Sequence, residues 1–90
     1  MKVSRIAQTC PACPSQWEGK GENGEDIYIR YRWGVLELDI DGETVYFIQH
    51  GGEYSGVLGT DEMEKLLSDY LDFSQAEWYA DNGNVYLVSF

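Results

Sequence analysis

The chain has 90 residues, 16 of them acidic and six basic, which gives a formal net charge of −10 and a pI near 4.2. This length allows one hydrophobic core but not two domains, and an aromatic content of 14% argues against a disordered chain. The strong negative charge disfavours direct binding to nucleic acid or to an anionic membrane surface, and no apolar run is long enough to span a bilayer.

The first 25 residues carry the weakest structural pattern. Residues 1–7 contain no apolar stretch of signal-peptide length, so the sequence predicts a cytoplasmic protein. Residues 2–8 and 15–20 can each add a strand to the sheet predicted further along the chain. The loop 21–25, which contains two glycines, would join them to that sheet.

Between these two segments lies the motif Cys10-Pro-Ala-Cys13-Pro, the most reactive one in the chain. Two thiols at this spacing suit a redox pair, but that chemistry needs a helix after the first cysteine, whereas the following residues predict a hairpin. The two thiols also suit half of a zinc site. His50 could supply a further ligand, or a second copy of the chain could supply two more thiols. We therefore expect structural thiols and no cofactor, with zinc as the first open alternative and a redox pair as the second.

Residues 26–49 predict a three-stranded antiparallel meander. The dipeptides Trp33-Gly34 and Asp41-Gly42 both fit the two-residue primed turns of β-hairpins. The two turns independently place the same apolar side chains on one face, which supports both assignments. These side chains are Ile27, Ile29, Tyr31, Leu36, Leu38, Ile40, Val45 and Phe47.

The second turn also predicts which residues of the last meander strand belong to the core. In the regular register, Val45 and Phe47 lie opposite Leu38 and Leu36 and therefore face the core. Tyr46 then lies on the other face of the meander.

That other face is polar, and the register places Arg30 opposite Glu37 and Tyr28 opposite Asp39. Cross-strand ion pairs on a solvated surface are the simpler interpretation. The alternative is a platform for a nucleotide or another anionic small molecule, since guanidinium groups stack and bind in forks. Its residues would be Tyr28, Arg30, Arg32 and Tyr46.

A helix is predicted over residues 61–71, after a glycine-rich connection that lacks the Gly-Lys-Ser/Thr ending of a phosphate-binding loop. Thr60 is the expected N-cap, and acidic residues occupy the first turn, where the helix dipole favours them. An apolar stripe at helical spacing should cover the apolar face of the sheet. The stripe consists of Met63, Leu66, Leu67, Tyr70 and Leu71.

A second hairpin, with its turn at Asn82-Gly83, is predicted over residues 75–90. Its strands carry apolar side chains on both faces, as is typical of an interior strand or an interface. The complete pattern indicates one α+β domain over residues 1–90. The expected sheet is antiparallel, has about five to seven strands and is covered by one helix.

The acidic residues are the strongest candidates for a functional surface. Spaced carboxylates on a folded surface can imitate the phosphates of nucleic acid and occupy the nucleic-acid-binding groove of another protein. The sequence contains no recognisable grouping of a nucleophile with a general base, so we do not predict an enzyme. The candidate partner-binding residues are Glu37, Asp39, Asp41, Glu43, Asp61, Glu62 and Glu64.

Two segments carry a resemblance to a known group: Cys10-Pro-Ala-Cys-Pro-Ser-Gln-Trp-Glu-Gly19 and Ile27-Tyr-Ile-Arg-Tyr-Arg-Trp-Gly34. Residues 8–38 thereby resemble short uncharacterised proteins of actinobacteria and their phages. The resemblance implies a phage or mobile-element accessory protein and carries over no functional residue.

We therefore predict a small acidic non-enzymatic protein that inhibits a host protein by engaging its basic surface. We expect the protein to bind neither nucleic acid nor a membrane directly. A homodimer is compatible with this prediction. Two alternatives remain open, a small-molecule or nucleotide-binding module and a small metal-binding domain built on the Cys-x-x-Cys motif.

Overall fold

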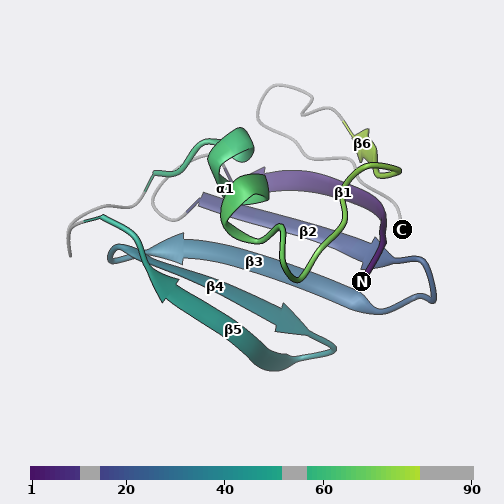
Figure 1. Cartoon of the computed structure of the whole chain (residues 1–90), viewed down its shortest axis with the longest axis horizontal. Coiled ribbons are helices and arrows are strands. Elements are labelled where there is room, and N and C mark those ends of the chain that lie inside the picture. The colour runs from purple at the N-terminus through teal and green to yellow at the C-terminus, as the bar shows by residue number, and fades with distance from the viewer. Residues whose placement is uncertain (11–14, 52–56, 80–90) are drawn as a thin grey trace.

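The computed structural model describes residues 1–10, 15–51 and 57–79 and has an open six-stranded sheet with one short helix against it (Figure 1). In chain order the elements are β1 (Val3–Cys10), β2 (Ser15–Gly21), β3 (Asp26–Arg32), β4 (Val35–Ile40), β5 (Glu43–Gln49), α1 (Thr60–Leu66) and β6 (Glu77–Tyr79). The strand order is β5-β4-β3-β2-β1-β6, and every pair is antiparallel except β1 with β6. The predicted α+β class is confirmed.

Both meander turns are the predicted primed turns. Trp33 and Gly34 have φ values of 58° and 72°, and Asp41 and Gly42 have φ values of 51° and 84°. These four residues lie in the left-handed region that such turns require. The predicted pairing of β3 with β4 is also confirmed, including Tyr28 opposite Asp39 and Arg30 opposite Glu37.

The pairing of β4 with β5 differs from the prediction because a β-bulge interrupts it. Asp39 pairs with Thr44, but the next residue of β4, Leu38, pairs with Tyr46, so that Val45 is the extra residue. Side chains alternate between the two faces of a strand, so one extra residue reverses the face of every residue that follows it.

The predicted core positions of Val45 and Phe47 are therefore wrong. Val45 is 50% exposed and Phe47 is 68% exposed, whereas Tyr46 and Ile48 pack against the core in their place. Tyr46 stacks on Tyr70 from the segment after α1, with 4.3 Å between the ring centroids.

Helix α1 is shorter than predicted, and Thr60 is not its cap. The N-cap position is Gly59, which provides no side-chain hydrogen bond. The Thr60 hydroxyl instead accepts a hydrogen bond from the Trp17 indole Nε1 at 3.1 Å, which connects the helix to β2. Beyond Leu66 the chain continues in turns, and the Leu71 N–H still donates to the Leu67 carbonyl at 2.9 Å.

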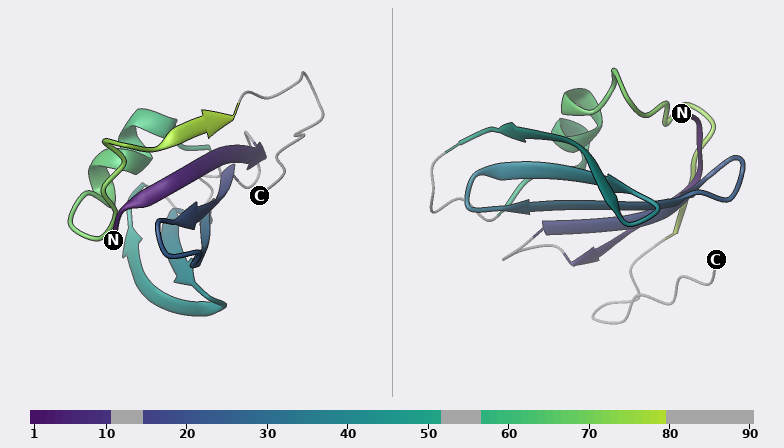
Figure 2. Two further views of the ribbon diagram at one scale, coloured as in Figure 1. Left: turned by 90° about the vertical axis from the view of Figure 1, so that its right-hand side faces the viewer. Right: turned by 90° about the horizontal axis from the view of Figure 1, so that it is seen from below.

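Figure 2 shows α1 lying against one face of the sheet. One apolar cluster fills the space between these two layers. The predicted stripe supplies the helical side of this cluster through Met63, Leu67 and Leu71, all buried. The sheet and the loop before α1 supply Val3, Ile6, Trp17, Ile27, Ile29, Tyr31, Leu36, Leu38 and Leu58. Burial of these side chains is the main source of stability in a domain of this size.

The predicted N-terminal strands are confirmed as β1 and β2. Of the predicted C-terminal hairpin, only β6 lies within the described residues; the Asn82-Gly83 turn and the strand after it lie outside them. No helix in the described ranges has both the length and the hydropathy to cross a lipid bilayer.

Candidate interaction surface

The sheet has two faces, and α1 lies on one of them (Figure 2). The side chains of β3, β4 and β5 that alternate with the core residues point to the opposite side, which we call the outer face. Its residues are Tyr28, Arg30, Arg32, Val35, Glu37, Asp39, Thr44, Phe47 and Gln49, and the exposed bulge residue Val45 adjoins them. The bulge thus adds two exposed apolar side chains to a face that the sequence predicts to be polar. Clustered exposed apolar groups mark interaction sites.

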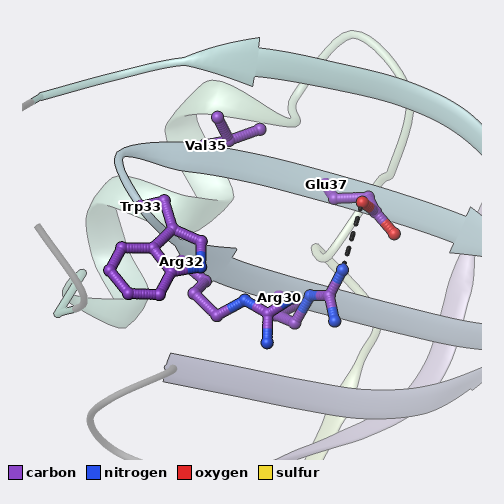
Figure 3. A pocket seen from close by; sticks show the side chains of 5 residues that line it. All are labelled: Arg30, Arg32, Trp33, Val35 and Glu37. Atoms are coloured by element: carbon purple, nitrogen blue, oxygen red, sulfur yellow. Dashed lines mark hydrogen bonds and ion pairs between the residues drawn. The ribbon is translucent and has the colours of Figure 1, made fainter. Parts of the chain in front are cut away.

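The β3–β4 turn presents a further large side chain beside this face. Trp33 is 62% exposed, although its positive φ is costly for a bulky residue. A depression of about 190 Å³ adjoins it, and Figure 3 shows the side chains of Arg30, Arg32 and Trp33 side by side there. Val35 and Glu37 complete the lining. Strain combined with exposure points to a role outside core packing.

The charges on the outer face compensate one another in part. Arg30 Nη2 lies 3.4 Å from Glu37 Oε1, as the dashed line in Figure 3 marks, which confirms the predicted cross-strand pair. Asp39 makes no such contact, and its buried Oδ1 has no hydrogen-bond partner among the described residues. The pair is half-buried, with 29% of the Arg30 side chain and 25% of the Glu37 side chain exposed.

Tyr28 experiences the same balance of charges. Burial raises the pKa of Tyr28, the Arg30 charge opposes this rise, and the carboxylates of Glu18, Asp39 and Glu37 add to it. Burial is therefore the main influence on the phenol, and Arg30 is the strongest single charge that acts on it. The phenol stays protonated at neutral pH and acts as a hydrogen-bond donor on this face.

The predicted ligand platform is only partly assembled. Tyr28, Arg30 and Arg32 share the outer face, but Tyr46 lies on the helix side against Tyr70, because of the bulge. Phe47 takes the position opposite Glu37 that Tyr46 was expected to fill. An aromatic side chain beside the arginines is supplied instead by Trp33 at the β3–β4 turn. The sequence did contain a signal for it, since a side chain at a two-residue hairpin turn points to solvent.

The seven candidate acidic residues do not form one surface. Glu37 and Asp39 lie on the outer face, and Asp41 and Glu43 lie at the adjoining β4–β5 turn. The other three belong to α1, on the opposite side of the sheet: Asp61, Glu62 and Glu64. Any single flat partner would contact one group and not the other.

The cysteine motif is described only at its first residue. Cys10 ends β1 and is half-buried, whereas Cys13 lies outside the described residues. A helix follows the first cysteine of a redox dithiol, whereas the described residues from Ser15 to Gly21 form strand β2. The His50 Nε2 lies 3.2 Å from the Glu62 carboxylate. Within the described ranges, no three potential ligands converge on a metal position.

Comparison with known proteins adds no further constraint: no family model matches the chain, no curated protein is similar to it, and no solved structure resembles it.

Proposed function

We propose that this protein is a non-enzymatic interaction module that binds a basic surface of another protein through its outer face and the adjoining β4–β5 turn. The observation that carries the proposal is the bulge in β5, which turns Phe47 and Val45 out to solvent next to acidic residues. Interfaces commonly combine a small apolar centre with a charged rim.

The apolar centre and the acidic rim would play different roles. Phe47 offers a large apolar side chain of the kind that dominates binding energy when a partner pocket buries it. Four carboxylates on β4 and at the β4–β5 turn, one of them directly opposite Phe47, would attract a basic partner and raise the association rate. They belong to Glu37, Asp39, Asp41 and Glu43. The acidic residues of α1 lie on the other side of the sheet and would contribute only to the long-range field.

The character of the partner follows from this charge pattern. A net charge of −10 favours a cationic surface, and the nucleic-acid-binding groove of a protein is one such surface. Occupation of such a groove would make the protein an inhibitor, in agreement with the resemblance of residues 8–38 to phage and actinobacterial proteins.

The proposal is tested by capture from a lysate of the organism that encodes the protein. The expected result is a basic partner retained in stoichiometric amount, with an affinity that falls steeply as salt is added. Phe47→Ala should weaken the complex by about tenfold or more. Val57→Ala, which removes another exposed apolar side chain away from the outer face, should leave it unchanged. Recovery of only abundant proteins in trace amounts would count against the proposal.

A second candidate function rests on the strained, exposed Trp33 beside Arg32. Here the depression in Figure 3 would bind a small aromatic anion such as a mononucleotide, with its base on Trp33 and its phosphate near the arginines. A mononucleotide should then raise the melting temperature by mass action, and Trp33→Ala should abolish this shift. An unchanged melting temperature at millimolar nucleotide would exclude this candidate.

A further inference from the structure

Strand β5 forms one edge of the sheet. Its pairing with β4 shows which of its backbone N–H and C=O groups point away from β4. The His50 N–H donates to the Gly34 carbonyl at 2.7 Å. In an antiparallel pair, the backbone groups of every second residue point toward the neighbouring strand. Those of Ile48 therefore point toward β4, and those of Phe47 and Gln49 point away from it. No strand in the described part of the chain pairs with this outer edge.

The exposed edge lacks most of the features that keep sheet edges from pairing. Residues 45–49 include no charged residue and no proline, which are the usual protections. The bulge at Val45 limits the regular edge to the residues after it. A groove of about 380 Å³ runs along the strand at Thr44, Val45, Tyr46 and Phe47. The edge is thus both accessible and apolar.

We propose that β5 pairs in antiparallel orientation with β5 of a second copy of this chain, around a two-fold axis at Phe47. The outward backbone groups of Phe47 would then bond those of Phe47 of the partner subunit, and the outward groups of Gln49 would bond those of the bulge residue, Val45 of the partner subunit. Phe47 lies opposite Phe47 of the partner subunit on the outer face. On the helix side, Tyr46 lies opposite Ile48 of the partner subunit. The two six-stranded sheets become one continuous sheet.

A second copy fits this edge because the contact is self-complementary despite the charge of each chain. The paired stretch is uncharged, and Glu43, the nearest charged residue of β5, falls opposite Gly51 of the partner subunit. Opposed aromatic side chains stabilise cross-strand pairs. Added salt should strengthen this contact, because it screens the repulsion between two chains of net charge −10. The pairing does not depend on the proposed function, and its salt dependence has the opposite sign to that of binding a basic partner.

The test is analytical ultracentrifugation of the full chain over a wide range of concentration and salt. We expect a monomer–dimer equilibrium that tightens as salt is added. Gln49→Pro removes a hydrogen-bond donor that points away from β4, so it should keep the fold and weaken the dimer about tenfold or more. Phe47→Lys should weaken it similarly, whereas Val57→Lys, which introduces the same lysine at another exposed apolar position, should not.

Amide hydrogen exchange of the unmodified chain provides an independent readout. The amides of Tyr46 and Ile48 should be protected from exchange at every protein concentration, because they donate hydrogen bonds to β4. Those of Phe47 and Gln49 should gain protection only as the dimer forms. A chain that stays monomeric throughout, a dimer indifferent to Gln49→Pro, or Phe47 and Gln49 amides that gain no protection on concentration would each overturn the pairing.

Discussion

At the scale of single residues, Trp33 shows a conflict between local backbone preference and the side chain that the sequence places there. A primed turn favours Asn or Gly at this position, because both tolerate positive φ. Tryptophan at φ 58° is strained, and most of its ring is exposed, so packing offsets little of the strain.

We therefore expect Trp33→Asn to stabilise the fold by up to about 1 kcal/mol, since Asn adopts the left-handed conformation more readily. Thermal unfolding followed by circular dichroism measures the change. A lower melting temperature in the Asn variant would mean that the indole contributes more to stability than its exposure indicates.

Leu67 represents the opposite case, a side chain whose only role is packing. It is fully buried, and its backbone carbonyl accepts the bonds that continue the chain beyond α1. Leu67→Ala should reduce the free energy of unfolding by about 2–5 kcal/mol, as core truncations of this kind do. Chemical denaturation checks this value. The matched substitution Leu66→Ala, at a partly buried position next to it, should cost less.

At the scale of elements, the strands were predictable to different degrees for a physical reason. In β3 and from Leu36 onward in β4 the core residues alternate with polar ones, so only one register buries the apolar set, and that register is the observed one. In β5, by contrast, Val45, Tyr46, Phe47 and Ile48 form an unbroken apolar run. Either set of alternate residues can fill the core, so the pattern does not exclude a bulge.

Helix α1 illustrates a second limit of prediction from sequence. Thr60 is a good N-cap residue in isolation, but the buried Trp17 indole needs a hydrogen-bond acceptor, and the Thr60 hydroxyl provides it. The tertiary contact thus outweighs the local preference. A partner on another strand is not visible in the local sequence.

The pKa of Glu64 in α1 leads to a pH-dependent prediction. Burial raises this pKa, and the charge of Asp61 raises it further. A carboxyl whose pKa is higher in the folded chain than in the unfolded chain destabilises the fold at pH values above its folded pKa. Glu64→Gln should therefore raise the melting temperature at pH 7. This gain should disappear as the pH falls below about 4, where both side chains are neutral. A gain of equal size at low pH would contradict this assignment.

At the scale of the whole molecule, the sheet divides the negative charge into two groups. Composition predicted the total charge and hence the class of partner, but only the fold shows that the acidic residues of α1 and those around β4 and β5 lie on opposite sides. The apolar centre of the outer face could not be predicted, because it depends on the bulge. The ion pair between Arg30 and Glu37 could be predicted from the sequence, because it depends only on the β3–β4 turn.

The two acidic groups should therefore differ in their effect on partner binding. Glu43→Gln and Asp61→Asn each remove one negative charge from an exposed side chain. We expect Glu43→Gln to slow association and weaken binding, because Glu43 lies at the β4–β5 turn, which the proposed contact includes. Asp61→Asn should have a smaller effect that disappears at moderate salt. Surface plasmon resonance with the captured partner measures both, and equal effects would place the contact elsewhere.

The bulge in β5 supports both the proposed interaction surface and the inferred pairing, and one nuclear Overhauser measurement tests it directly. Residues that face each other without sharing hydrogen bonds in an antiparallel pair bring their α-hydrogens close together. With the bulge, a strong contact between the α-hydrogens of Glu37 and Phe47 is expected. A strong contact between those of Glu37 and Tyr46 instead would show a regular hairpin, with Phe47 in the core, and would contradict the account.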